Sequence, residues 1–308
     1  MNPFAASYAS KLKVGDIVEV LPYRQILETL DENGQLENMP FMPEMLQYCG
    51  QQFRVYKRVN YVCIDGNGMR GLSRTVNLEN IYCDGFNHDN CQRSCTLFWK
   101  DAWLKKCSDG MGVNDIQKTS IKDTDGLKTH VDNGKQYICQ STRLMEASIE
   151  VKGLSKISHL LRESLSGNRK FSKFLADLFS YIHFKLGKNS PKSHCQFLIG
   201  EGSGTSRESL NLQPGDWVEV KSKEEIKRTL DKYGKNRRLV FTSEMHHFCG
   251  KRFRVRQRLD KMISEKNGQM IQLKDTVLLE DVVCYGICKL GCSRYLHHWW
   301  REIWLRKV

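Results

Sequence analysis

Residues 44–55 read EMLQYCGQQFRV, and residues 244–255 read EMHHFCGKRFRV. These stretches belong to a longer repeat, because residues 15–59 align with 215–259 without a gap and 19 of the 45 positions are identical. The match resumes with TVNLENIYC (75–83) over TVLLEDVVC (276–284) and closes with FWKDAWL (98–104) over WWREIWL (299–305). The chain therefore carries two copies of one module.

Each copy predicts short strands and one helical insert. GDIVEV (15–20) and FRVYKRV (53–59) alternate apolar and polar residues, which is typical of half-buried strands. QILETLDENG (25–34) has apolar residues at helical spacing and a glycine stop. Several short strands separated by turn signals favour a small β-barrel. We expect a mainly β protein with some α-helix.

The order of these elements carries a resemblance. A Gly-Asp strand, a Met-x3-Cys-Gly phrase, two further strands and a terminal Trp-x3-Trp-Leu resemble the SH3-like barrels. The full layout, with CDGFNHDNCQRSC (83–95) and WWREIWL (299–305), resembles an uncharacterised bacterial family of tandem cysteine-containing SH3-like modules. The resemblance covers nearly the whole chain and implies architecture only, since no activity is established for that family.

Three regions follow from this layout. We expect SH3-like module 1 over residues 1–106, a partly helical linker over 107–210 and SH3-like module 2 over 211–308. Within the linker, YICQSTRL (137–144) is expected as a short strand, and residues 153–165 and 170–188 as helices. The amphipathic 170–188 segment suits packing between the modules better than a membrane surface.

Charge and hydropathy limit the cellular setting. Residues 1–106 hold 12 basic and 12 acidic residues, whereas 211–308 hold 21 and 12, so most of the net charge of +13 lies in the second copy. The mean hydropathy is −0.51, and no apolar run is long enough to span a bilayer. The first residues lack the apolar core of a signal peptide. A cytoplasmic protein is expected.

In a protein expected in the cytoplasm, twelve cysteines indicate a chemical role. In a reducing compartment they indicate metal ligands or reactive thiols rather than disulfides. Each copy offers four thiolates to a structural metal, namely Cys49, Cys83, Cys91 and Cys95 in the first and Cys249, Cys284, Cys288 and Cys292 in the second. Thiolate ligands select zinc or an iron–sulfur cluster, and zinc is the preferred prediction. His88 could replace one thiolate. Alternatively, Cys49 and Cys249 are core residues.

Catalysis is not predicted, because Cys139 has no sequence-local base and no acid–base pair stands out. The tryptophans four residues apart indicate core packing, which leaves Phe98 or Trp299 for contact with a partner. We therefore predict a non-enzymatic adaptor that binds a protein or peptide. The alternative is nucleic-acid binding through a basic strand with Arg252, Arg254, Arg256 and Arg258. The third interpretation is an iron–sulfur or redox protein.

Overall fold

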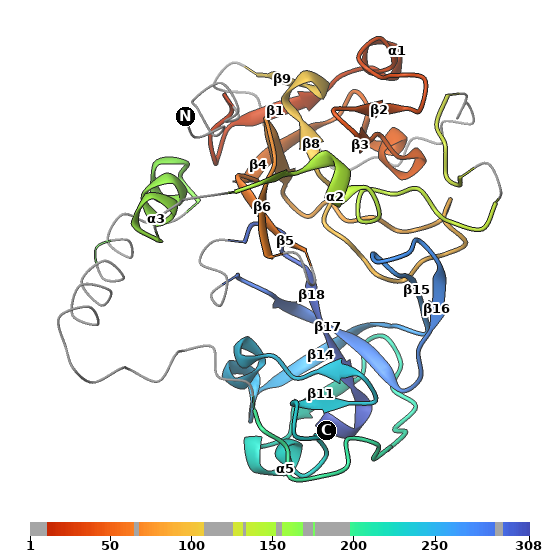
Figure 1. Ribbon diagram of the computed structural model, residues 1–308, viewed down its shortest axis with the longest axis vertical. Helices are drawn as coiled ribbons and strands as arrows, with labels where there is room; N and C mark the ends of the chain where they lie inside the picture. The colour runs from red at the N-terminus through yellow and green to blue at the C-terminus, as the bar shows by residue number, and fades with distance from the viewer. Residues whose placement is uncertain are drawn as a thin grey trace. The chain divides into compact units, whose positions relative to one another are not determined.

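The computed structural model describes residues 11–64, 68–107, 126–131, 134–151, 156–168, 175, 198–286 and 292–308. It is mainly β with short helices, which confirms the predicted class (Figure 1). The contacts divide the chain into two compact units. The first comprises Met1–Ser180, Ile263–Met270 and Lys289–Arg294, and the second comprises Tyr181–Met262, Ile271–Cys288 and Tyr295–Val308. Two segments of the second sequence repeat thus belong to the first unit.

The first repeat builds a five-stranded antiparallel sheet in the order β8-β7-β4-β1-β9. Its strands are β1 (Ile17–Val20), β4 (Gln52–Arg58), β7 (Thr75–Leu78), β8 (Trp99–Lys100) and β9 (Leu104–Lys106). The helices are α1 (Tyr23–Leu27) and the 3₁₀ helices Pro43–Tyr48 and Asp101–Trp103. Shorter strands complete the repeat: β2 (Gln35–Leu36), β3 (Met39–Pro40), β5 (Tyr61–Ile64) and β6 (Gly68–Gly71).

The second repeat builds the same sheet in the order β18-β17-β14-β11-β19. Its strands are β11 (Trp217–Val220), β14 (Arg252–Arg258), β17 (Thr276–Val283), β18 (His297–Arg301) and β19 (Leu305–Lys307). The helices are α5 (Lys223–Lys227) and the 3₁₀ helices Ser243–Phe248 and Glu302–Trp304. The short strands are β12 (Lys235–Asn236), β13 (Leu239–Val240), β15 (Lys261–Ile263) and β16 (Met270–Gln272).

The Cys-Gly phrase of the repeat forms a turn that connects a 3₁₀ helix to the first strand of the repeat. Cys49 ends the helix Pro43–Tyr48, and Gly50 follows with a φ of +75°. The Gly50 N–H donates to the carbonyl of Val20 in β1, at 2.8 Å. Gly250 has the same φ and makes the same 2.8 Å bond to Val220 in β11. Glycine takes this left-handed conformation at little cost, which explains its presence in both copies.

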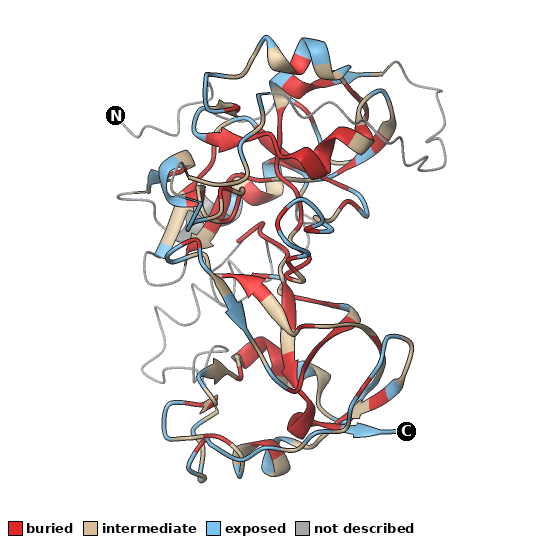
Figure 2. Ribbon diagram, turned by 90° about the vertical axis from the view of Figure 1, so that its right-hand side faces the viewer, coloured by how far each residue is buried: buried red, intermediate tan, exposed pale blue. Residues whose placement is uncertain are grey.

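The tryptophans of the repeat form the cores, as the sequence predicts. Trp99 and Trp103 are fully buried in the first unit, and Trp300 and Trp304 are fully buried in the second. Trp103 and Trp304 each donate an indole N–H to a threonine of their own repeat, at 3.1 Å. Figure 2 shows the buried residues concentrated on the strands of each sheet.

Between the repeats, the structure differs in part from the predicted elements. A helix is present where residues 153–165 predict one, as α3 (Lys156–Leu165), and two short elements precede it, α2 (Leu144–Ala147) and β10 (Ile149–Glu150). The strand predicted over 137–144 is wrong: beyond a single bridge at Tyr137 the segment turns, because Thr142 Oγ1 bonds the backbone at Cys139 and Tyr137. The predicted helix 170–188 lies outside the described residues, apart from Leu175. None of the helices within the described ranges is long and apolar enough to span a membrane.

The Cys-Gly turn generates a test of stability. We expect Gly50→Ala to lower the free energy of unfolding by about 1 to 2 kcal/mol, because an L side chain is strained at this φ. No atom lies within 4 Å of a Cβ placed at Gly50, so the cost comes from the backbone alone. Gly50→Asn is the matched control and should cost less, since asparagine tolerates the left-handed region. Urea unfolding measures both; equal losses would contradict the backbone explanation.

Candidate metal centre

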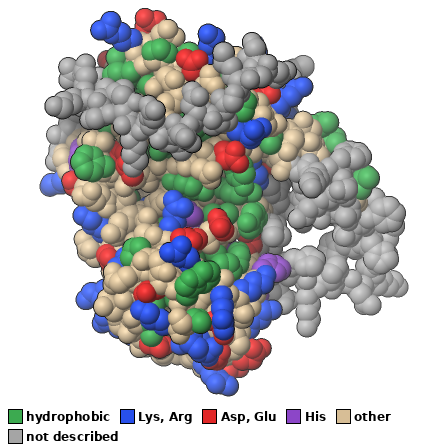
Figure 3. All heavy atoms as spheres, turned by 180° about the vertical axis from the view of Figure 1, so that it is seen from behind, with side chains coloured by type: hydrophobic (Ala, Val, Ile, Leu, Met, Phe, Trp, Pro, Cys, Tyr) green, Lys and Arg blue, Asp and Glu red, His purple; other side chains and the backbone are tan. Residues whose placement is uncertain are grey.

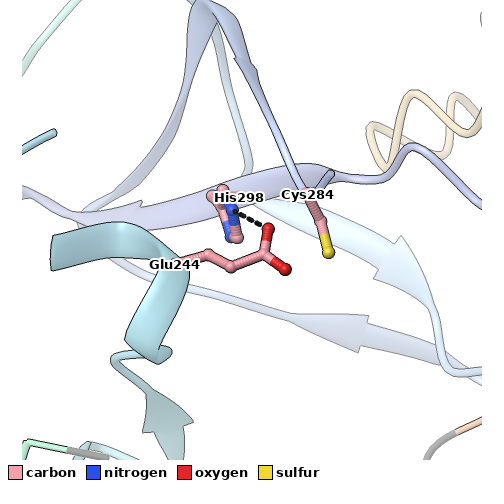
Figure 4. Close-up of side chains that lie close together, drawn as sticks. All are labelled: Glu244, Cys284 and His298. Atoms are coloured by element: carbon pink, nitrogen blue, oxygen red, sulfur yellow. Dashed lines mark ion pairs between the residues drawn. The ribbon is translucent and has the colours of Figure 1, made fainter. Parts of the chain in front are cut away.

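Three potential metal ligands meet in the second unit. Glu244 lies on the 3₁₀ helix Ser243–Phe248, Cys284 directly follows β17, and His298 lies on β18 (Figure 4). One ligand atom from each side chain lies within 4.8 Å of the other two. In the parts of the chain that the structure describes, no other group of three histidine, cysteine or acidic side chains is this close.

Local structure places each of the three. Glu244 precedes the core residue Met245 in the 3₁₀ helix, and its carboxylate accepts the Tyr285 N–H at 2.9 Å. The Cys284 N–H donates to the carbonyl of Leu296 at 2.8 Å, which holds the end of β17 against the chain entering β18. His298 is two residues from buried Trp300, so the two side chains share one face of β18. The residues are therefore held by the backbone of three different elements.

The burial and the protonation state of His298 suit a metal ligand. Its side chain is 7% exposed, and none of the described residues hydrogen-bonds to Nε2. Burial lowers the pKa of His298 to about 4, although the Glu244 charge opposes this shift. The imidazole is therefore neutral at ordinary pH, and a neutral imidazole can bind a metal through its lone pair. A buried nitrogen without a partner carries a desolvation cost that a bound metal would remove.

The distances also fit a metal better than a catalytic triad. His298 Nε2 lies 3.9 Å from the nearest Glu244 oxygen, which is too long for a hydrogen bond. Nitrogen and oxygen ligands of a tetrahedral zinc ion lie about 3.3 Å apart, so a small contraction would close the site. The carboxylate is 6% exposed, and a substrate therefore has little access to it. Carboxylate, thiolate and imidazole are all zinc ligands.

The equivalent place in the first unit holds an ion pair. Glu44 corresponds to Glu244 and Cys83 to Cys284, but buried Leu97 occupies the position of His298. A histidine from the loop after β7 takes its place: His88 is 1% exposed, and its Nδ1 lies 2.5 Å from the Glu44 carboxylate. The Nε2 atom lies 2.8 Å from the carbonyl oxygen of Ile138. Both ring nitrogens face acceptors, so this pocket suits an imidazolium, which has no lone pair for a metal.

The cysteines of the two predicted four-cysteine sets lie in different surroundings. Cys49 and Cys249 pack against the cores of their units, and burial raises the pKa of both thiols. In the first unit, Cys83 also packs against the core, and the Cys95 Sγ lies 3.4 Å from the Ser141 hydroxyl. Cys288 lies outside the described residues. An all-thiolate site in either copy stays a prediction.

Cys91 and Cys292, the third aligned pair, make equivalent contacts within the first unit. The Cys91 sulfur accepts the Ile263 N–H at 3.3 Å, and the Cys292 sulfur accepts the Cys63 N–H at 3.2 Å. Arg93 and Arg294, each two residues further on, donate to the carbonyls of Ile263 and Cys63. Each Cys-x-Arg segment therefore binds a β-hairpin strand of the other sequence repeat, which gives these cysteines a structural role.

The predicted binding residues have different exposures. Phe98 is 3% exposed and belongs to the first core, so its ring offers no surface to a partner, whereas Trp299 is half-buried. On β14, Arg252 and Arg254 are exposed, and Arg256 is half-buried. Arg258 pairs with Asp260 and buried Glu302, both at 3.1 Å. It therefore serves the fold of the second unit.

Sequence analysis missed two of the three clustered residues. Of the three, only Cys284 is among the predicted ligands, and neither Glu244 nor His298 is. The signals were present, since Glu-Met and the aligned cysteine occur in both copies, and a His-His pair precedes Trp299. What they lacked was the sheet register, which brings residues 244, 284 and 298 to one point.

The Glu44–His88 pair predicts a pH dependence. Burial alone would lower the pKa of His88, but the hydrogen bond and charge of Glu44 outweigh it and raise the pKa above its ordinary value of 6.5. The stabilisation is therefore complete below pH 6.5 and is lost as the pH rises through the folded-state pKa. We expect the urea midpoint to fall as the pH rises above about 6.5, and His88→Gln to remove that part of the slope. Replacing exposed His247 with Gln is the control; an unchanged slope in His88→Gln would contradict the imidazolium.

Comparison with known proteins assigns no family to the chain. No protein-family model matches it, and neither the curated proteins nor the solved structures gave a match. The argument for a metal centre therefore depends on the geometry of Glu244, Cys284 and His298 and on the buried nitrogen that faces the carboxylate.

Proposed function

We propose that the chain is a non-enzymatic adaptor whose second unit is stabilised by one zinc ion bound to Glu244, Cys284 and His298. The observation that carries the proposal is His298 Nε2, a buried nitrogen without a hydrogen-bond partner beside two further ligand atoms. The fourth zinc position would be taken by water or another side chain. Iron–sulfur clusters are held mainly by thiolates, so a mixed carboxylate, thiolate and imidazole set favours zinc over the iron–sulfur interpretation.

The ion would join three segments of the second unit that are separate in the sequence. The ligands come from a 3₁₀ helix, the end of β17 and β18, and the chain between β17 and β18 contains the glycines Gly286 and Gly291. Zinc binding contributes folding free energy, because the assembled site does not exist in the unfolded chain. In the first unit the Glu44–His88 pair replaces the ion. The proposal is therefore one zinc per chain, where the cysteine alignment predicted one in each copy.

The sheets support a finer assignment of the architecture. Each repeat contains a five-stranded sheet with the same strand order and a 3₁₀ helix before the last strand, which is consistent with two SH3-like barrels of the tandem cysteine-containing family. Such barrels bind partners on an exposed strand and loop surface. In the second unit β11 exposes Trp217, which is 53% exposed and pairs across the sheet with Arg254. We propose this surface as the contact for a protein or peptide partner.

Nucleic acid is the alternative partner, favoured by the basic strand β14. Arg252 and Arg254 are exposed there, but Arg252 already lies 3.5 Å from Glu219. Figure 3 shows Lys and Arg side chains interspersed with Asp and Glu over the described residues of the face it draws. A surface of mixed charge gives weaker binding to phosphates than a continuous basic stripe. The protein partner therefore remains the preferred proposal.

The zinc proposal predicts the metal content of the full-length protein. Plasma mass spectrometry after purification without chelator should find about one zinc per chain, the number a single site implies. His298→Leu, which copies the residue at position 97 of the first repeat, should lose the ion. Cys284→Ser should weaken zinc binding strongly and serves as a second variant if His298→Leu does not fold.

Cys249→Ser is the matched control and should retain the zinc, because Cys249 packs against the core outside the cluster. A chelator should lower the thermal midpoint of the wild type but leave that of His298→Leu unchanged. If His298→Leu retains the zinc and Cys91→Ser or Cys95→Ser loses it, the metal is bound by the four-cysteine set instead. Protein without metal would end the proposal.

A gel-shift measurement distinguishes a protein partner from nucleic acid. We expect the full-length protein to shift single- or double-stranded DNA in a gel no more than the double variant Arg252→Glu/Arg254→Glu does. Arg258 is left unchanged, because its loss would leave buried Glu302 without this cation. A salt-sensitive shift that the double variant abolishes would replace the adaptor proposal with nucleic-acid binding.

A further inference from the structure

Two cysteines that are distant in the sequence meet in the first unit. Cys63 lies on β5, and Cys292 lies in the segment Lys289–Arg294 that belongs to the same unit. Their sulfur atoms are 3.1 Å apart, although the residues are separated by 229 positions. A disulfide requires about 2.05 Å between the sulfurs, so a movement of about 1 Å would allow the bond.

The surroundings of this pair contain a hydrogen-bond donor and positive charge. The Cys63 N–H points at the Cys292 sulfur, and hydrogen bonds to sulfur stabilise its anion. Arg294 donates to the Cys63 carbonyl at 3.1 Å, which places its guanidinium beside the pair. Arg294 and Arg93 both pair with the single carboxylate of Glu265, so two cations meet one anion. The local charge is positive, as the sites of reactive cysteines typically are.

Burial raises the pKa of several other thiols of the first unit, Cys91 among them. Burial raises the pKa of Cys49 to about 12 and that of Cys139 to about 11, and it also raises the pKa of Cys83. These thiols stay protonated and are poor nucleophiles at ordinary pH. Cys63 is only partly buried, whereas Cys292 is 2% exposed. A small reagent therefore reaches Cys63 first, with Cys292 behind it.

We propose that Cys63 and Cys292 form a reversible disulfide when the protein meets a low-molecular-weight disulfide such as oxidised glutathione. Cys63 loses its proton to solvent and attacks the reagent, which forms a mixed disulfide and releases one thiolate. The Cys292 thiolate, its proton also lost to solvent, then attacks the Cys63 sulfur and releases the second thiolate. Two protein thiols are oxidised, the reagent is reduced to two thiols, and the released thiolates take up the two protons.

The bond would fasten the second-repeat segment around Cys292 to β5 of the first unit. In the reduced protein that attachment depends on hydrogen bonds, including those of Arg294 and the Ser293 N–H to the Tyr61 carbonyl. In the oxidised protein it becomes covalent. The inference is independent of the zinc proposal, because none of the three zinc ligands takes part.

Peptide mapping of the full-length protein tests the inference directly. After incubation with oxidised glutathione, blocking of free thiols and non-reducing trypsin digestion, residues 59–70 should be linked to residues 290–294. We expect the link to form at least about tenfold faster in the folded protein than in urea, because the fold pre-orients the sulfurs. Dithiothreitol should reverse it.

Three variants make the outcome decisive. Cys63→Ser should abolish the link without creating another, and Cys292→Ser should leave Cys63 trapped as the glutathione mixed disulfide. Cys107→Ser, at the end of the β9 segment, should form the link at the wild-type rate. Circular dichroism confirms that each variant is folded. Singly glutathionylated cysteines without the link in the wild type, or a link between other cysteines, would overturn the inference.

Discussion

The hydrogen bond from the Cys-Gly turn to the first strand of the repeat, β1 or β11, is the contact on which each repeat depends. The N–H groups of Gly50 and Gly250 donate to Val20 and Val220, which are the buried ends of β1 and β11. This bond sets the 3₁₀ helix against the sheet and directs its glutamate inward. Glu44 and Glu244 are therefore buried in both copies, at 3% and 5% exposure. A buried carboxylate must be paired, and the two copies pair it differently.

The two copies share a sheet order but surround the buried glutamate with different side chains. In the first unit the carboxylate meets a histidine from a loop, whose second nitrogen faces a carbonyl, so a proton balances the charge. In the second unit the histidine comes from β18, and no described residue hydrogen-bonds to its Nε2. Leucine at 97 and histidine at 298 occupy equivalent positions, and the first unit adds His88 from a loop. The five-stranded sheets have the same strand order in both units.

The cysteines of the chain divide by environment rather than by alignment. Cys49 and Cys249 are aligned and act as core residues beside the glycine turn. Cys91 and Cys292 are aligned and accept backbone N–H groups from a strand of the other repeat. Cys284 is a candidate ligand, whereas its counterpart Cys83 is enclosed by the core. Cysteine spacing alone does not separate these roles, because a thiol also serves as a small apolar group and as a weak acceptor.

The sequence by itself determined the duplication, the mainly β class, the tryptophan cores and the helix at α3, because alternation, helical spacing and repeated phrases are local properties. It also selected Cys284 and His88 as residues of interest. Only the tertiary structure decided that residues 244, 284 and 298 converge, that His88 pairs with Glu44 and that Cys63 meets Cys292. These contacts join residues 14 to 229 positions apart in the chain. Sheet register and the course of the loops set such distances, and neither is encoded in local periodicity.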